Sequence, residues 1–95
     1  MTAAQEVLEE SRPRFARGVR LADSQAQGGT VLLGPERVFK PDPIALAILQ
    51  HCDGTSSVGQ IVERLAALYD APRERLMSDV KMLLGSLADK RLLEL

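Results

Sequence analysis

Residues 29–40 read Gly-Thr-Val-Leu-Leu-Gly-Pro-Glu-Arg-Val-Phe-Lys, and this stretch decides how the rest of the chain can be arranged. Thr30–Leu33 is β-branched and apolar, as strands are, and the Gly34-Pro35 pair that follows is typical of a turn. An extended pattern resumes at Arg37–Lys40, so the stretch predicts a β-hairpin. Its last strand has no obvious partner before the helical patterns begin. A strand left at a sheet edge offers unpaired N–H and C=O groups, which are either guarded against aggregation or used to capture an extended peptide.

The residues before the hairpin predict a loose arm and one more strand. Residues 1–16 are polar and contain good helix formers up to Pro13, which predicts a flexible or frayed-helix N-terminal arm. Residues 17–95 are expected to form a single domain. Its first strand is predicted at about residues 18–22, and the hairpin supplies two more strands at about residues 30–33 and 37–40.

Helical periodicity governs the chain after the hairpin. Three helices are predicted, over residues of about 43–52, 58–69 and 72–90. Asp42 is a suitable N-cap with Pro43 at the first helical position, and Ser57 with Gln60 forms a capping box before the second helix. The fold class is therefore predicted as α+β and winged-helix-like, with a small three-stranded antiparallel sheet followed by a three-helix bundle.

Composition limits the functions that are open to the chain. Its 95 residues suit one domain, and the net charge of −1 provides no global field to attract nucleic acid or an anionic membrane. The single cysteine rules out an internal disulfide and fits a reducing compartment. The N-terminus lacks the features of a signal peptide, and no run of about 18 apolar residues predicts a membrane span. A cytoplasmic location is expected.

Catalytic chemistry is poorly represented in the sequence. The only histidine and the only cysteine are His51 and Cys52. Neighbours on a helix point about 100° apart, so these two side chains cannot face one substrate as a base and a nucleophile. A metal site would need three or four ligands at suitable spacing. We therefore expect no enzyme, no metal and no cofactor.

Two other classes of function stay open. The second and third predicted helices resemble a helix-turn-helix, which suggests a DNA-binding regulator. Five cationic side chains in the third helix and the segment after it are offset by four acidic ones, which argues against that function. The other alternative is a structural homodimer, since a sheet joined to its helices by the short Pro41–Pro43 link could be exchanged between two copies.

A basic run lies before the first strand and within it. Its members are Arg12, Arg14, Arg17 and Arg20, with no acidic residue between them. The run is either a solubilising feature or an electrostatic contact with an acidic partner, with Arg14, Arg17 and Arg20 as the candidate partner-contact residues.

The order of several short motifs resembles the pyrroloquinoline quinone (PQQ) biosynthesis protein D family, PqqD. The motifs are Arg17-Gly18-Val19-Arg20-Leu21, Val31-Leu32-Leu33-x-Pro35-Glu36, Ala45-x-x-Ile48-Leu49-x-x-Cys52-Asp53-Gly54, Val58-x-x-Ile61-Val62-x-x-Leu65, Tyr69-x-Ala71-Pro72 and Asp79-Val80-x-x-Leu83-Leu84-x-x-Leu87. Each motif is weak alone, but the collinear series covers about residues 13–95 and is fairly specific. One departure is Lys40-Pro41-Asp42-Pro43, which replaces a Lys-Leu-Asn-like junction, and its first proline limits how far the edge strand can run.

The resemblance implies a peptide-binding role without catalysis. Proteins of this family bind the ribosomal precursor peptide of PQQ and present it to a radical S-adenosylmethionine (SAM) enzyme, which cross-links a Glu and a Tyr side chain in the peptide. The leader peptide adds as a further strand beside the third strand, with apolar side chains facing the third helix. Mapped onto this chain, the peptide-binding residues are Arg37, Val38, Phe39 and Lys40 for the strand, with Met77, Lys81 and Leu84 for the helix wall. Alternation allows only one of Val38 and Phe39 to face inward. The chain is expected to be a monomer or a domain-swapped homodimer.

Overall fold

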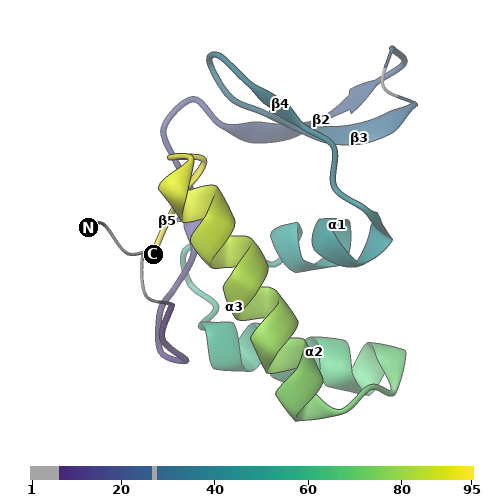
Figure 1. The fold of residues 1–95 in the computed structure, drawn as a ribbon, viewed down its shortest axis with the longest axis vertical. Helices are drawn as coiled ribbons and strands as arrows, with labels where there is room; N and C mark the ends of the chain where they lie inside the picture. The colour runs from purple at the N-terminus through teal and green to yellow at the C-terminus, as the bar shows by residue number, and fades with distance from the viewer. Residues whose placement is uncertain (1–6, 27) are drawn as a thin grey trace.

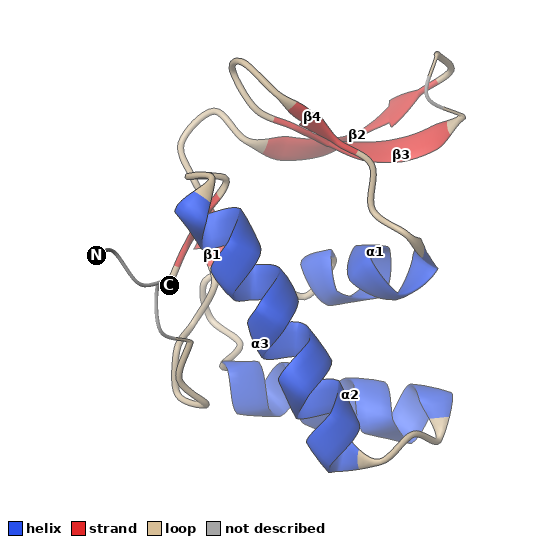
Figure 2. Cartoon of the chain, viewed as in Figure 1, coloured by secondary structure: helices blue, strands red, loops and turns tan. Residues whose placement is uncertain are grey.

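The computed structural model describes residues 7–26 and 28–95. Its elements, coloured along the chain in Figure 1, are β1 (Arg14–Phe15), β2 (Arg20–Ser24), β3 (Gly29–Leu33), β4 (Val38–Phe39), α1 (Pro43–Leu49), α2 (Val58–Tyr69), α3 (Arg73–Asp89) and β5 (Leu93–Glu94). A sheet of β2, β3 and β4 lies at one end of the molecule, and α1 and the end of α3 lie beneath it (Figure 2). The predicted α+β, winged-helix-like class is confirmed.

The three-stranded sheet is an antiparallel meander in the order β2-β3-β4. β3 is its central strand and pairs with β2 on one side and β4 on the other. Its apolar residues Val31 and Leu32 suit this position, and both are fully buried. The predicted hairpin turn is present, and the Gly34 N–H donates to the Arg37 carbonyl at 2.9 Å.

The outer strands differ from their predicted bounds for local reasons. β2 begins at Arg20 rather than at residue 18, because Gly18 has a φ of +81° and the Val19 N–H closes a turn onto the Ala16 carbonyl. β4 ends at Phe39, two residues before Pro41, which has no N–H with which to continue a ladder.

The helix starts follow the predicted capping signals. The Ala45 N–H donates to Asp42 Oδ1 at 2.7 Å, and Ser57 and Gln60 form the complete reciprocal capping box of α2. α2 has the predicted bounds, and α3 is one residue shorter at each end than the predicted 72–90.

α1 ends at Leu49 rather than at residue 52. The N–H groups of His51 and Cys52 each bond to the carbonyl three residues earlier, which winds this end of the helix more tightly than an α-helix.

An aliphatic core joins the sheet to all three helices. Its fully buried members include Leu32, Ile48, Leu49, Val58, Ile61, Val62, Leu65, Val80, Leu84 and Leu87. No helix within the described part of the chain is long and apolar enough to cross a bilayer.

The predicted N-terminal arm is wrong for residues 7–16, which pack on the domain as an extended segment. β1 pairs with β5 in the register Arg14↔Glu94 and Phe15↔Leu93. The carbonyls of Glu9 and Ser11 accept hydrogen bonds from Gly59 and Val58 in the first turn of α2. The first N–H groups of a helix have no partner within it, so they attract such carbonyls. The rest of the predicted arm, residues 1–6, lies outside the described residues.

Candidate functional site

The outer edge of β4 is the site that the sequence singles out. β4 pairs with β3 on one side, in the register Leu32↔Phe39 and Leu33↔Val38. Because the Gly34–Arg37 pair is hydrogen-bonded, the alternation of an antiparallel ladder makes Leu32–Phe39 a bonded pair as well, and leaves Leu33–Val38 unbonded. The N–H and C=O of Val38 therefore point away from β3, toward the open edge.

The register also decides which side chain of β4 faces the helices. Directly opposed residues share a face of the sheet, so Phe39 lies on the same face as the fully buried Leu32. Phe39 packs against the core, whereas the side chain of Val38 is 53% exposed on the other face. Of the predicted strand residues, Phe39 thus offers a side chain to the groove, and Val38 offers its backbone. Lys40 is exposed and lies two residues after Val38, so in an extended chain its N–H and C=O point to the same side as those of Val38. The carbonyl of Arg37 instead points to β3 and accepts the Gly34 N–H.

The structure does not bring Met77, Lys81 and Leu84 to the side of α3 that faces β4. Leu84 is fully buried, and Met77 packs against the core. Lys81 lines a hollow beside Val7 and Met82, near the N-terminal segment. At about 100° per residue, these three positions lie on one flank of the helix.

The opposite flank of α3 faces β4 and α1. The ammonium of Lys90 lies 5.9 Å from the centroid of the Phe39 ring, within the range of a cation–π contact. Leu83 and Asp79 lie about two and three helical turns earlier on the same flank, and both line a hollow against α1. The spacing of residues 79, 83 and 90 predicts that they share one flank of the helix. It does not predict which flank the sheet covers.

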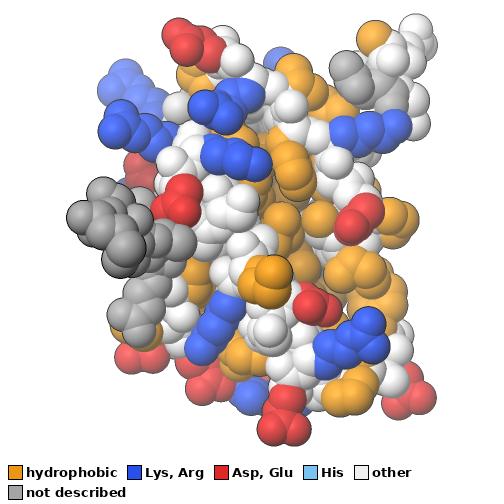
Figure 3. Space-filling model, in the orientation of Figure 1, with side chains coloured by type: hydrophobic (Ala, Val, Ile, Leu, Met, Phe, Trp, Pro, Cys, Tyr) orange, Lys and Arg blue, Asp and Glu red, His pale blue; other side chains and the backbone are white. Residues whose placement is uncertain are grey.

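An apolar hollow of about 280 Å³ opens between α1 and α3. Its lining residues are Asp42, Ile44, Ala45, Ile48, Asp79 and Leu83. Figure 3 shows the hydrophobic side chains that gather between the sheet, α1 and the upper half of α3. We call this hollow, with Phe39 and the open edge of β4, the β4–α3 groove.

The three predicted partner-contact arginines occupy different surroundings. Arg14 pairs with Glu94, with its Nη2 2.8 Å from Oε1, so this charge is already compensated. Arg17 lines a second hollow at the β3–β4 turn, together with Arg37 and Lys90. Arg20 is exposed at the start of β2.

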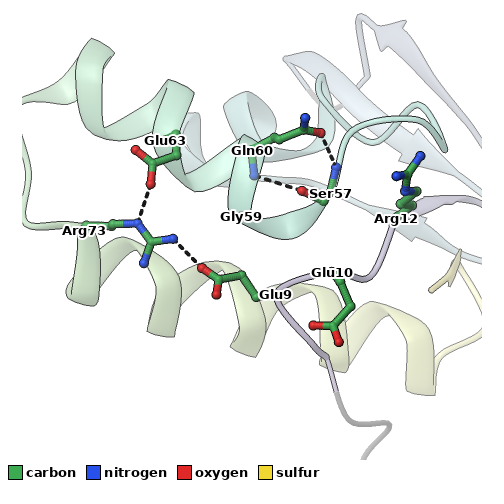
Figure 4. Close-up of a pocket in the computed structure, with 8 residues that line it drawn as sticks. All are labelled: Glu9, Glu10, Arg12, Ser57, Gly59, Gln60, Glu63 and Arg73. Atoms are coloured by element: carbon green, nitrogen blue, oxygen red, sulfur yellow. Dashed lines mark hydrogen bonds and ion pairs between the residues drawn. The ribbon is translucent and has the colours of Figure 1, made fainter.

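A further hollow of about 450 Å³ lies on the far side of α2 from the sheet and is built around Arg73 (Figure 4). The Arg73 guanidinium bonds to the carboxylates of Glu9 and Glu63, the latter at 2.6 Å. These bonds raise the pKa of Arg73 and lower the pKa of Glu9. The arrangement ties the N-terminal segment to α2 and α3 and pairs the charge of Arg73 at the start of α3.

Cys52, the single cysteine of the sequence, is buried. Burial raises the pKa of the Cys52 thiol to about 12, so this thiol stays protonated at neutral pH. Residues 7–26 and 28–95 contain no group of three or more His, Cys, Asp or Glu side chains that could hold a metal ion.

The sequence profile described as "Coenzyme PQQ synthesis protein D (PqqD)" matches residues 29–93 of the chain. The chain belongs to the PqqD family. A PqqD relative from Bradyrhizobium diazoefficiens, named "PqqA binding protein", is 46% identical over 84 residues, which cover 88% of this chain and 82% of the relative. The resemblance that the sequence motifs indicated is confirmed.

Two solved structures share the fold of this PqqD chain. The PqqD portion of Methylobacterium extorquens PqqCD is described as a stand-alone recognition element for ribosomally synthesized and post-translationally modified peptides. It is 39% identical, with a TM-score of 0.80, and the match covers 94% of this chain and 95% of that one. Lasso peptide synthetase B1, solved with a leader peptide, is 20% identical and has a TM-score of 0.76 over 90% of this chain and all of that one. At that identity the second structure bears on the fold alone.

Proposed function

We propose that this chain binds the PqqA precursor peptide of PQQ biosynthesis by strand addition to β4 and presents it to the radical SAM enzyme that cross-links a Glu and a Tyr in the peptide. The chain acts in this role as a binding protein and not as an enzyme, and the expected location is the cytoplasm. Two findings support peptide binding: membership of the PqqD family, and the name of the relative that is 46% identical.

The observation that carries the proposal is an open strand edge beside an apolar hollow. A peptide placed along β4 can bond to the outward N–H and C=O of Val38 and to the in-phase groups of Lys40. Alternate side chains of that peptide would then face Ile44, Ile48 and Leu83. Main-chain bonds supply binding in this mode, and the hollow supplies selectivity for apolar side chains.

The DNA-binding alternative has weaker support. Arg73, at the start of α3, is held by Glu9 and Glu63, and Glu74 follows it. The remaining arginine of this turn, Arg75, adjoins Glu74, so the helix end that would enter a DNA groove carries little net positive charge. The homodimer alternative stays a prediction, and light scattering with and without peptide tests it.

Calorimetric titration with a synthetic PqqA peptide tests the proposed function. We expect saturable binding with one peptide per chain. Absence of saturable binding, both for the chain alone and with the radical SAM enzyme present, would contradict the proposal.

A Val38→Pro substitution tests the strand-addition mode. Proline removes the outward N–H of Val38 and leaves the inward bonds of β4 in place, so peptide affinity should fall at least about tenfold while the helices stay folded. Val38→Ala keeps the N–H and is the matched control, with affinity expected within about threefold of wild type. Equal affinity in Val38→Pro and Val38→Ala, with unchanged circular dichroism, would refute strand addition and leave peptide binding itself intact.

A further inference from the structure

A cationic hollow of about 290 Å³ lies where the β3–β4 turn meets the C-terminal end of α3. Its lining residues are Arg17, Pro35, Glu36, Arg37, Lys90, Arg91 and Leu92, so four side chains are positive and one is negative. Figure 3 shows Lys and Arg side chains gathered over this end of the molecule.

The four cations of this hollow take no part in the ion pairs that the described residues form. The ion pairs among the described residues involve Arg14 and Arg73, and none involves Arg17, Arg37, Lys90 or Arg91. The carbonyl end of α3 contributes only about half a negative charge, which four cations exceed. The hollow is therefore suited to a carboxylate.

The cationic hollow adjoins the β4–α3 groove at Lys90. Lys90 lines the hollow and also lies over Phe39, at the edge of the groove. The other end of the groove carries the opposite sign, since Asp42 and Asp79 line the apolar hollow. A peptide along β4 thus meets positive charge at one end and negative charge at the other.

We propose that this charge gradient sets the register of the bound peptide. An acidic side chain of the peptide, Asp or Glu, occupies the cationic hollow while neighbouring apolar side chains occupy the hollow between α1 and α3. Sliding the peptide toward α1 brings its carboxylate toward Asp42 and Asp79, which repel it. The inference rests on the proposed function and adds the chemistry that selects one alignment of the peptide.

Charge-neutralising variants test the protein side of this inference. The probe is synthetic PqqA of the Bradyrhizobium diazoefficiens relative, titrated at 50 mM and 500 mM NaCl. Arg37→Gln/Arg91→Gln should lower the affinity about tenfold at low salt and less than about threefold at high salt, because exposed charge pairs are screened. Arg75→Gln, an exposed arginine in the first turn of α3, is the matched control and should stay within about twofold of wild type.

Peptide variants identify the carboxylate that the hollow holds. Each acidic residue of the peptide is changed to its amide, one at a time. One such change should weaken binding to the wild-type chain and have no further effect on Arg37→Gln/Arg91→Gln, since both remove the same contact.

The outcomes separate this inference from the proposed function. No binding of the probe to the wild-type chain overturns the proposed function. Wild-type binding with unchanged affinity in Arg37→Gln/Arg91→Gln overturns the charge-register inference alone, as does a salt-dependent loss that couples to no peptide carboxylate. Because Arg91 has a positive φ, Arg17→Gln/Arg37→Gln serves as a second variant with the same expectation.

Discussion

At the scale of single residues, Cys52 and Asp53 are neighbours whose side chains meet opposite environments. Cys52 is buried among aliphatic side chains, and its thiol donates to the Ile48 carbonyl at 3.5 Å. Asp53 is exposed, yet the backbone N–H groups of Ser56 and Thr55 donate to its carboxylate at 2.9 Å. These bonds hold the pKa of Asp53 well below its usual range. One residue is a core filler and the other organises the loop before α2.

The lowered pKa of Asp53 predicts a dependence of stability on acid. A carboxylate whose pKa is lower in the folded state stabilises the fold above its unfolded pKa of about 3.9, and this contribution is lost as pH falls below that value. Asp53→Asn should therefore be less stable than wild type at pH 7, and the difference should narrow below about pH 4.

Urea unfolding between pH 3 and pH 7 measures this effect. Some acid sensitivity should remain in Asp53→Asn, because the pKa of Glu9 is also lowered by Arg73. Glu10→Gln, at an exposed carboxylate, is the control and should follow the wild-type profile. A constant difference between Asp53→Asn and wild type over the whole range would contradict the assignment.

At the scale of elements, the hairpin turn depends on a close approach between Gly34 and the segment after α3. A Cβ added to Gly34 would lie 2.8 Å from Leu92 Cδ2, and Leu92 is itself buried. Overpacking of this kind typically costs about 1–3 kcal/mol, so Gly34→Ala should lower the free energy of unfolding by that amount.

A double-mutant cycle in urea checks the cause of that loss. Leu92→Val removes bulk from the contact, and Gly34→Ala should cost less in its presence than in wild type. Strictly additive effects of the two substitutions would show that the contact is not responsible.

The element scale also explains what the sequence could and could not predict. Helix starts were predictable because Asp42, Pro43 and the Ser57–Gln60 box act locally. The strand edge was predictable from turn residues and alternation. The side of α3 that lines the groove could not be predicted. Residues on both flanks of its buried row have suitable spacing, and only the packing of the sheet decides which flank lies next to β4. The β1–β5 pair escaped prediction because two-residue strands joined across the whole chain leave no periodic signal.

At the scale of the whole molecule, Arg73 joins three separate parts of the chain. It lies at the start of α3 and bonds to Glu63 of α2 and Glu9 of the N-terminal segment. Backbone carbonyls of the same segment accept hydrogen bonds from N–H groups in the first turn of α2. The ion pairs and the backbone bonds therefore support one another.

Arg73→Gln should loosen the N-terminal segment without unfolding the domain. The amides of Val58 and Gly59, which bond to Ser11 and Glu9, should exchange their hydrogens about two- to fivefold faster, because exposed ion pairs contribute little each. Hydrogen exchange followed by NMR measures this, and 1 M NaCl should accelerate the same amides in wild type. Unchanged exchange at these amides would show that the backbone bonds alone hold the segment.

The shortness of β4 bears on how fast an extended ligand dissociates. The strand has only two residues, and Pro41 closes the ladder soon after it. An extended ligand can therefore form few main-chain bonds at this edge, and differences in affinity between related complexes lie mostly in how fast they dissociate. In the proposed role, where the peptide is passed to an enzyme, a short residence time favours that transfer. In the proposed strand-addition mode, Pro41 would therefore limit how long a peptide stays bound.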